Sequence, residues 1–409
     1  CHARHAMELQ GVPIAVLADL KGAALDAGMQ RLALVGGVVR DWLLHRRQGR
    51  PWAGVPDLDW VVEGDAARLA SVLQTRCGTQ RVTSVQEHGA FGTVAFQLDG
   101  IPLDLATARQ EHYPAPAENP VVQGGTLQAD LARRDFTINA MAFDLVANEL
   151  IDLHHGQEDL ALGQLRFLHV GSVQDDPTRV IRAARYAARL GFQLAEESSK
   201  QIRSTIQEWP WDWRQGDAAT AAPPALSTRL RMELERLLER EPWPQALDLL
   251  EQWQALPLLD SQLQKDPWRK QRLQWAQRLG LPLMPALLLR AADPVAVAQR
   301  LQIPGKQQHW LQECGELRDW LVDTPPPLEA TPSIWSTAIE QQGWPPEVVA
   351  LAVTLKPKQW KPLLRWWGRW RRIQAPQTAR ALIAAGWQPG PAIGEELRRQ
   401  RSAAQDRSR

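Results

Sequence analysis

The sequence predicts an α+β head, built on a small β-sheet with helices, followed by an all-α neck, body and tail. Up to about residue 155, runs typical of strands alternate with helical patterns. From about Leu160 onward the strand-like runs disappear and amphipathic helical patterns dominate. Ala/Pro-rich segments at 216–226 and 323–332 predict loops between helical blocks. We therefore expect a head at 1–155, a neck at 156–215, a body at 216–322 and a tail at 323–409.

The composition is that of an ordinary globular protein. Hydrophobic residues make up 44% and charged residues 23% of the 409 positions. We find no apolar run near the ~20 residues that a membrane helix needs, and no secretory signal. The three cysteines are too few and too scattered for a disulfide framework or a cysteine metal site. We expect a cytoplasmic protein that does not contact a membrane, and the sequence indicates no protein partner.

Two adjacent glycines separate a predicted strand from a predicted helix. The apolar run ends at Val35, Gly36 and Gly37 follow, and a helical pattern containing Arg40 begins directly after them. Glycine lets the backbone approach an anion closely, and the free N–H groups at a helix start point toward it. This arrangement predicts a phosphate-binding turn. The alternative is an ordinary tight turn, with Arg40 paired to its neighbour Asp41.

Two carboxylates, Asp57 and Asp59, follow one residue apart. On a strand, alternation places both on one face and Leu58 on the other. Carboxylates held side by side repel each other unless a cation lies between them, and hard oxygen ligands suit Mg²⁺. Asp104, in another strand-like run, is the candidate for a third carboxylate. The pattern predicts a magnesium site, although such a pair is also common on protein surfaces.

A second cluster consists of Arg133, Arg134 and Asp135, which precede an apolar segment containing Ile138 and Met141. We expect that segment to form an amphipathic helix. Guanidinium groups bind phosphate oxygens in a fixed fork geometry, so two adjacent arginines suit a polyphosphate. The alternative is an ordinary basic start of a helix.

A third cluster lies at the start of a predicted helix that ends at Gly191, a residue typical of helix C-caps. Asp176 and Arg179 are three positions apart there, so their side chains are expected to share one face. A carboxylate and a guanidinium on one rigid face present an acceptor and donors to the edge of a flat heterocycle. An ordinary salt bridge between these two residues is the alternative.

Together, these motifs resemble a known family. Gly36–Asp41 followed by Asp57–Asp59 resembles the motif of the nucleotidyltransferase superfamily that includes DNA polymerase β. Arg133–Ala142 and Asp175–Phe192 narrow the resemblance to the bacterial-type, class II tRNA nucleotidyltransferases and their poly(A) polymerase relatives. The resemblance covers roughly residues 30–240, in the order of that family.

The resemblance implies a reaction as well as a fold. The family adds C, C and A to the 3′ end of tRNA from CTP and ATP without a nucleic-acid template. Asp57 and Asp59 would bind two Mg²⁺ ions, with Asp104 as the third catalytic carboxylate, for in-line attack on the α-phosphorus. Asp176 and Arg179, in the neck, would read the edge of C or A by side-chain hydrogen bonds.

The resemblance also implies a set of nucleotide contacts in the head and neck. The glycine turn and Arg40 would hold the triphosphate, the adjacent arginines would close on the nucleotide, and Asn139 would contact the metal or the ribose. The full set of implied nucleotide-binding residues is Gly36, Gly37, Arg40, Arg133, Arg134, Asp135, Asn139, Asp176, Arg179, Arg182 and Arg185.

The chain departs from the family motifs at two places. Asp175–Asp176 stands where the family often has Glu-Asp, a conservative change. In a later helical motif that usually reads near ERIRxEL, Thr228 stands where the glutamate falls. The second departure leaves the role of that helix open.

Other activities share these motifs. An enzyme that adds only A or only CC, or a poly(A) polymerase, is the first alternative. Residues 107–122 lie where the family has its specificity loop, and their presence argues against an enzyme that adds only CC. A tRNA-binding protein without catalytic activity is the second alternative, and the intact Asp57 and Asp59 argue against it.

The C-terminal third combines basic and aromatic residues. Because the net charge is only +1, a basic surface must come from such local clusters. In residues 356–374, lysines and arginines alternate with tryptophans, a composition that suits either RNA contact or a helical core. The resemblance, in which the tail grips tRNA, favours RNA contacts at Arg365, Arg369, Arg371 and Arg372, with most tryptophans in the core. The last ten residues, from Gln400, are expected to fray.

Overall fold

The computed structural model describes residues 7–89 and 92–408. The chain divides into two compact units. The first comprises residues up to Arg214 together with Pro223–Ala255, and the second comprises Gln215–Ala222 and Leu256–Arg409. Among the described residues, no helix is both long enough and apolar enough to cross a membrane.

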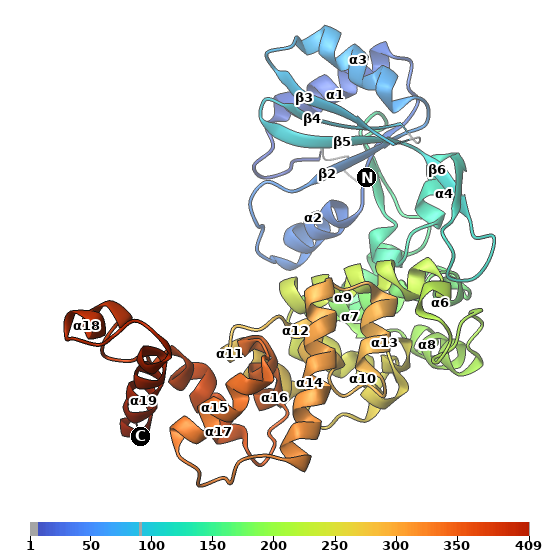
Figure 1. The fold of residues 1–409 in the computed structure, drawn as a ribbon. Helices are drawn as coiled ribbons and strands as arrows, with labels where there is room; N and C mark the ends of the chain where they lie inside the picture. The colour runs from blue at the N-terminus through green and yellow to red at the C-terminus, as the bar shows by residue number, and fades with distance from the viewer. Residues whose placement is uncertain (1–6, 90–91, 409) are drawn as a thin grey trace. The chain divides into compact units, whose positions relative to one another are not determined.

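A mixed β-sheet forms the centre of the head (Figure 1). Within the described residues it has seven strands in the order β3-β4-β5-β2-β1-β8-β9. Strands β2 and β5 run parallel, and the other neighbours run antiparallel. The strands are β1 (Leu32–Val35), β2 (Leu58–Val62), β3 (Val82–His88), β4 (Thr93–Leu98), β5 (Ile101–Thr107), β8 (Ala142–Asp144) and β9 (Glu149–Ile151).

Helices α1 (Ile14–Asp26) and α3 (Ala66–Cys77) pack together along strands β3–β5 (Figure 1). The side chain of Asp65 caps α3 by accepting a hydrogen bond from the N–H of Ala67. Alternate residues of β4 are buried, as expected for a strand with one face on a core. These two helices therefore cover one face of the sheet, and the opposite face is available for other elements.

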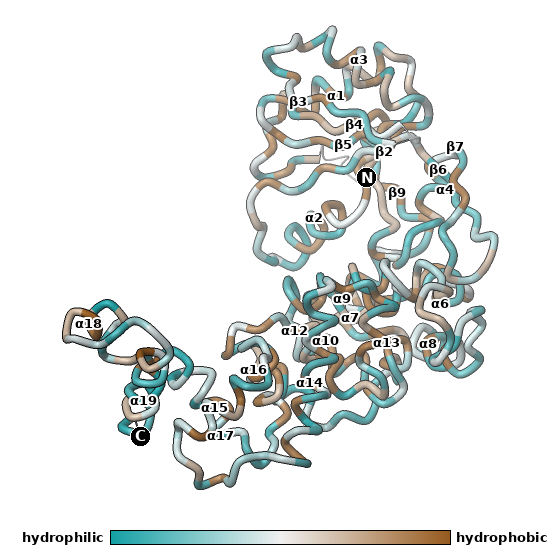
Figure 2. The backbone as a smooth tube through the Cα atoms, in the orientation of Figure 1, coloured by the Kyte–Doolittle hydropathy of each residue, from teal (hydrophilic) through white to brown (hydrophobic). Residues whose placement is uncertain are grey.

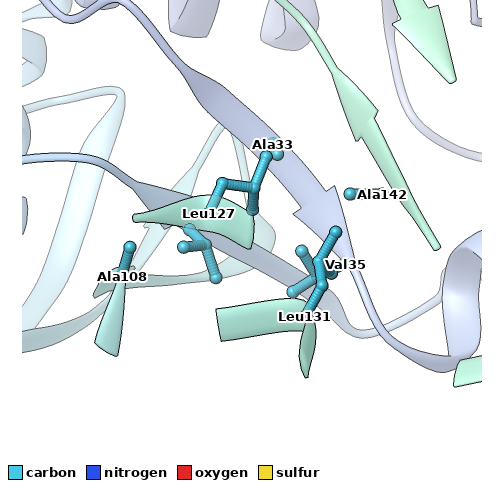
Figure 3. Close-up of a cluster of buried hydrophobic side chains, with 7 residues drawn as sticks. Ala33, Val35, Ala108, Leu127, Leu131 and Ala142 are labelled. Carbon is cyan, nitrogen blue, oxygen red and sulfur yellow. The ribbon is translucent and has the colours of Figure 1, made fainter. Parts of the chain in front are cut away.

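A second cluster of buried side chains covers part of the opposite face (Figure 3). Val35 pairs with Asp59 across β1 and β2 and with Ala142 across β1 and β8, so these side chains lie on one face. Helix α4 (Leu127–Ala132) packs Leu127 and Leu131 against it. The packing of α4 therefore brings the residues that follow it, Arg133 and Arg134, close to the strand that carries Asp59.

The prediction of a helix after Arg134 is wrong. Residues Thr137–Asn139 form a single 3₁₀ turn, and Ala142–Asp144 form strand β8, which pairs with β1. Ile138, Met141 and their apolar neighbours are buried all round rather than along one stripe. A short, continuous apolar run of that kind is typical of a strand buried on both faces.

Two small sheets accompany the main one. Strands β6 (Arg109–His112) and β7 (Val121–Gly124) form an antiparallel hairpin. Strands β10 (Gln164–Leu165) and β11 (Gln193–Leu194) form a short parallel pair. The second pair corrects the expectation that strands end near residue 160.

Helices make up the rest of the first unit. Helix α7 packs against both α9 and α10, and it ends at Gly191, whose φ of +70° confirms the predicted C-cap. The helices are α2 (Gly37–Gln48), α5 (Gly156–Leu162), α6 (Ser172–Asp175), α7 (Thr178–Leu190), α8 (Glu196–Glu208), α9 (Thr228–Arg240) and α10 (Trp243–Gln252).

The second unit is helical in its described residues. Helix α16 contains a continuous apolar run (Figure 2), and all residues from Val348 to Thr354 are buried. The loop predicted at 323–332 joins α14 to α15, as expected. The helices are α11 (Arg269–Arg278), α12 (Leu283–Leu288), α13 (Pro294–Leu301), α14 (Gly305–Asp323), α15 (Pro332–Gln342), α16 (Pro346–Thr354), α17 (Trp360–Gly368), α18 (Ala379–Ala384) and α19 (Pro391–Arg407).

Residues 400–408 do not fray as predicted, and Arg409 lies outside the described residues. Residues 400–407 form the end of α19, which packs against α15. Gln405 is buried and donates from Nε2 to the carbonyl of Trp370 over 3.1 Å. Asp406 accepts hydrogen bonds from the N–H and the hydroxyl of Ser333. These long-range contacts hold a segment whose local composition gives no sign of order.

Candidate functional site

A pocket of about 600 Å³ opens in the first unit. Its walls come from the turn after β1, the start of β2, the β6–β7 hairpin, the segment after α4, and helices α7 and α9. Its lining is Gly36, Gly37, Asp59, Arg109, Glu111, Tyr113, Asn119, Pro120, Arg133, Arg134, Asp135, Asn139, Asp176, Thr178, Arg179, Arg182, Tyr186, Arg229, Met232, Glu233 and Arg236.

The glycine turn forms one edge of this pocket. Gly36 has a φ of +81°, which favours glycine, and α2 begins at Gly37, one residue before its predicted start near Val38. A Cβ atom built on Gly36 would lie 3.9 Å from Nη1 of Arg134 and 3.9 Å from Oδ2 of Asp59. The turn therefore brings free backbone N–H groups, a guanidinium and a carboxylate to one place.

The carboxylates gather at the start of β2 and the middle of β5. Asp57 precedes β2, and Leu58 is buried while Asp57 and Asp59 are exposed, as the alternation predicted. Asp59 and Asp104 are paired residues of the parallel strands. Although Asp59 keeps exposed surface, surrounding protein atoms remove part of the hydration of its carboxyl. This desolvation, the Asp104 charge and the Asp57 charge raise the pKa of Asp59, and Arg134 opposes this shift. The three acids therefore interact electrostatically.

Carboxylate oxygens are the ligands that Mg²⁺ prefers, and in proteins it is usually bound by one or two carboxylates, water and substrate phosphates. The uncompensated negative charge around Asp59 fits such a cation. Among the residues that the structure describes, no group of three or more His, Cys, Asp or Glu side chains is arranged as a metal site.

Arg133 and Arg134 are held by acidic side chains. Nη2 of Arg134 donates to Asp130 over 3.0 Å, and Nη1 of Arg133 donates to Glu111 of the hairpin over 3.3 Å. The side chain of Asp130 is 1% exposed and also accepts from the N–H of Arg109. Burial and the neighbouring Arg133 charge lower the pKa of Arg134. The two guanidinium groups are thus fixed in orientation on the pocket wall.

Four guanidinium donors of the pocket are unsatisfied. The Nε atoms of Arg109, Arg133 and Arg134 and the Nη1 atom of Arg229 are buried and have no hydrogen-bond partner among the described residues. Buried donors are paired in most proteins, by protein, water or ligand. Four such donors in one pocket indicate a site for an anion rich in acceptors.

Arg40 belongs to a neighbouring hollow. Its Nη1 donates to Oδ1 of Asn139 over 2.7 Å, and Nδ2 of Asn139 donates to Asp135 over 3.2 Å. Burial alone would raise the pKa of Asp135, but Arg182, Asn139 and the N–H of Phe136 lower it overall. These predicted residues therefore form one connected network.

The neighbouring hollow, about 480 Å³, shares a wall with the main pocket. Gly37, Asp59 and Tyr186 line both. The hollow adds Asp57 and Arg40, which the main pocket lacks among its described lining residues. Asp59 therefore faces two connected spaces.

Asp176 and Arg179 both line the main pocket, but the salt bridge considered for them is replaced by other contacts. Asp176 lies before α7, in extended conformation, so the two side chains do not follow each other along one helical face. Asp176 instead forms an ion pair with Arg229 of α9. Arg179 donates to the carbonyl of Ser172 over 2.9 Å, and its guanidinium lies 5.8 Å from the ring centre of Tyr113.

Arg182 and Arg185 have different positions. Arg182 lines the pocket and donates to Asp135 over 2.7 Å. Arg185 is buried behind it and donates to Glu233 over 2.6 Å and to Glu241 over 3.3 Å. The structure therefore brings together most of the predicted nucleotide contacts and separates Arg185 from the described pocket lining.

Sequence reasoning missed the residues that the hairpin and α9 contribute. The segment expected to be a specificity loop contributes Arg109, Glu111 and Tyr113 to the pocket. The prediction covered that segment as a whole and named none of its residues as pocket residues. Arg229 directly follows Thr228, the position at which this helix departs from the family motif. The pocket residues of α9 could have been suspected from the alternating arginines and glutamates of that helix.

The tail arginines lie in the second unit. Arg365, Arg369 and Arg372 are exposed, while Arg371 is half-buried and donates to the carbonyl of Trp367. Trp366 and Trp370, of the same segment, are buried, which confirms a core position for these two.

Comparisons with known proteins agree with this geometry. Residues 32–166 match the family described as the Poly A polymerase head domain. A CC-adding tRNA nucleotidyltransferase of Deinococcus radiodurans is 33% identical over 384 residues, which cover 90% of this chain and 82% of that protein. The chain belongs to the tRNA nucleotidyltransferase family. This result confirms the resemblance carried by the motifs, and the protein is an enzyme of the nucleotidyltransferase class.

Two further relatives show how much of the chain is similar to known proteins. An A-adding tRNA nucleotidyltransferase of Aquifex aeolicus is 41% identical over 179 residues, 43% of this chain, which span only 20% of that enzyme's length. A structure of the Thermotoga maritima CCA-adding enzyme complexed with tRNA superposes with a TM-score of 0.69 at 22% identity, over 98% of this chain and 93% of that one. This match confirms the predicted fold class. Members of the family generally use divalent metal ions.

Proposed function

We propose that this chain adds C, C and A to the 3′ end of tRNA from CTP and ATP, without a nucleic-acid template and with release of pyrophosphate. The four unsatisfied guanidinium donors of the main pocket carry this proposal, because a nucleoside triphosphate offers the anionic acceptors that they lack. The Deinococcus relative, which acts on tRNA by its name, aligns over nearly the whole chain. We propose the cytoplasm as the location.

The head residues would bind the triphosphate and the reacting groups. The N–H groups at the start of α2, next to Gly36, face the same space as Arg134 and suit phosphate oxygens. Arg133 and Arg134, fixed by Glu111 and Asp130, would orient the nucleotide for in-line attack on the α-phosphorus. Positioning and charge compensation are the main contributions of these residues.

Asp57 and Asp59 would hold two Mg²⁺ ions, with Asp104 as the third carboxylate. The raised pKa of Asp59 supports this assignment, since desolvation and the charges of Asp104 and Asp57 raise it. When bound, the ions supply an activated primer 3′-hydroxyl and charge compensation for the leaving pyrophosphate. The chain's own part is to present Asp59 and Asp104 from paired positions of β2 and β5, with Asp57 directly before β2.

The neck would select the base. Asp176 and Arg179 follow the head residues in the sequence and line the same pocket, and both are buried. A carboxylate and guanidinium groups at that wall suit the hydrogen-bonding edges of C and A. The tail arginines of the second unit would contact the tRNA backbone.

One assay tests the proposed function. tRNA ending at the discriminator base, at C or at CC is incubated with CTP, ATP or both, and the products are sequenced. We expect each substrate to be completed to CCA and not extended further. The absence of any addition by the wild-type chain would refute the proposal.

The alternative of addition of CC alone has one observation in its favour, the name of the Deinococcus relative. The same assay separates the two activities. An enzyme that adds only CC leaves the tRNA that ends at CC unchanged when ATP is supplied, whereas the proposed enzyme adds A. Extension by many A residues would instead indicate a poly(A) polymerase.

A further inference from the structure

Arg229 occupies an unusual place in the pocket. It is the second residue of α9, it lines the pocket, and its Nη2 donates to Oδ2 of Asp176. Its Nη1 is buried and has no hydrogen-bond partner among the described residues. One end of this guanidinium therefore holds a carboxylate, while the other retains an unused donor.

Asp176 is fixed next to it. Oδ1 accepts from the N–H of Thr178 over 3.1 Å and from its hydroxyl over 2.5 Å. A carboxylate offers about four acceptor positions, and these two bonds and the bond from Arg229 use three of them. Asp176 and Arg229 thus present one remaining acceptor beside a free donor.

Arg179, by contrast, is directed toward the backbone. Its Nη1 donates to the carbonyl of Ser172 over 2.9 Å and its Nη2 donates to the carbonyl of Arg133 over 3.4 Å. Its guanidinium also lies near the ring of Tyr113. These contacts join the neck to the head and the hairpin, and they leave Arg229 as the direct partner of Asp176.

We propose that Arg229, paired with Asp176, is a specificity-determining residue that reads the base of the incoming nucleotide. The inference rests on the proposed function, because it assigns a role in the same pocket. C and A both carry an exocyclic amino donor next to a ring-nitrogen acceptor, whereas U and G carry an acceptor next to an N–H donor. An acceptor beside a donor therefore complements C and A as a class, and faces U and G with like groups.

The test is nucleotide binding by the full-length chain. The dissociation constants of CTP, UTP, ATP and GTP are measured for the wild type and for Arg229→Gln, Arg229→Lys and Arg231→Gln. Arg231 lies on the same helix, pairs with Glu235 over 3.3 Å and is not part of the described pocket lining, so it is the matched control. We expect Arg229→Gln to reduce the preference for CTP over UTP and for ATP over GTP at least tenfold. The control keeps both preferences.

Arg229→Lys separates reading of the base from support of Asp176. Lysine keeps the positive charge beside Asp176 but lacks the fixed second donor of a guanidinium. We expect this variant to keep the wild-type melting temperature and to lose most of the base preference. A wild-type preference in both Arg229 variants would overturn the inference, as would a wild-type chain that binds the four nucleotides equally.

The addition assay keeps the two proposals distinguishable. If the wild type adds no nucleotide to tRNA, yet Arg229→Gln loses the base preference in binding, the proposed function fails and the role of Arg229 stands. If the wild type completes CCA and Arg229→Gln incorporates C and A with wild-type selectivity against U and G, the inference fails and the function stands.

Discussion

Asp59 and Asp104 occupy paired positions on the parallel strands β2 and β5. Paired residues of neighbouring strands point to the same face, so the two carboxylates lie beside each other above the sheet. The Asp104 charge, after burial, is the largest cause of the raised pKa of Asp59. The positive charge of Arg134 opposes this shift without cancelling it. The fold therefore concentrates negative charge at the place where the proposed chemistry needs a cation.

The first prediction concerns activity. Asp57→Ala and Asp59→Ala should each lower nucleotide addition by on the order of a thousandfold, because a catalytic metal contributes several kcal/mol and each 1.4 kcal/mol is tenfold in rate. tRNA affinity should stay nearly unchanged. Asp26→Ala is the control, since Asp26 is exposed and pairs with Arg76 away from the pocket. Near-normal turnover in either site variant would contradict the metal assignment.

A second prediction concerns stability and pH. The raised pKa of Asp59 means that the folded state binds more protons than the unfolded chain between pH 3.8 and the raised value. The stabilising contribution of the protonated form is present below pH 3.8 and is lost as the pH rises through the raised pKa. Asp59→Asn should therefore melt at a higher temperature than the wild type at pH 7, and the difference should vanish in acid.

Two controls sharpen that measurement. Arg81 lowers the pKa of Asp99, so Asp99→Asn should not raise the melting temperature at pH 7. Millimolar MgCl₂ should raise the melting temperature of the wild type more than that of Asp59→Asn, because ligand binding to the folded state adds stability. Equal melting curves for Asp59→Asn and the wild type across the pH series would show that the charged Asp59 does not destabilise the folded protein.

Local chemistry made part of this site predictable. Gly36 stands where the chain needs a positive φ, and Gly191 caps a helix for the same reason. The alternation around Leu58 follows from strand geometry alone. Each of these features depends on neighbours a few residues away, and such neighbours are visible in a sequence.

Long-range pairing was not predictable in the same way. Asp176 and Arg179, three residues apart, were expected to share one helical face, with a salt bridge between them as the alternative. Asp176 instead pairs with Arg229, 53 residues on, because α9 packs against α7. The buried run near Ile138 has no alternation that separates a helix from a strand, and its pairing with β1 decided the outcome. No periodic pattern encodes either partner.

A third prediction concerns the buried ionic network behind the pocket. The side chain of Glu241 is 1% exposed and pairs with Arg185 and Arg189. Glu241→Ala should lower the free energy of unfolding by about 3–5 kcal/mol, because it leaves Arg185 buried without one of its partners. Glu241→Gln keeps hydrogen-bond acceptors and should cost less.

Chemical denaturation measures these changes. Glu239→Ala, at an exposed position of α9 two residues before Glu241, should change the free energy of unfolding by less than about 0.5 kcal/mol. A Glu241→Ala variant as stable as this control would mean that the network does not support the neck.

The fourth prediction concerns the tail. If the exposed Arg365 and Arg372 contact tRNA phosphates, neutralising both with glutamine should weaken tRNA binding and flatten its salt dependence. Each phosphate contact adds about 0.7–0.9 to the slope of log affinity against log salt concentration, so the slope should fall by about 1 to 2. The rate of addition on saturating tRNA should stay nearly unchanged, because the carboxylates lie in the head.

The competing explanation is a tail that serves only as scaffold. Trp366 is buried, and Trp366→Ala should then lower stability by about 3–5 kcal/mol whether or not the tail binds RNA. The matched control for charge is Lys200→Gln with Arg203→Gln, two exposed cations of α8 in the first unit. Affinity measured over a salt series separates the explanations. A slope and an affinity equal to those of this control would leave Arg365 and Arg372 without a role in binding tRNA, since phosphate contacts cannot be lost without releasing fewer counterions.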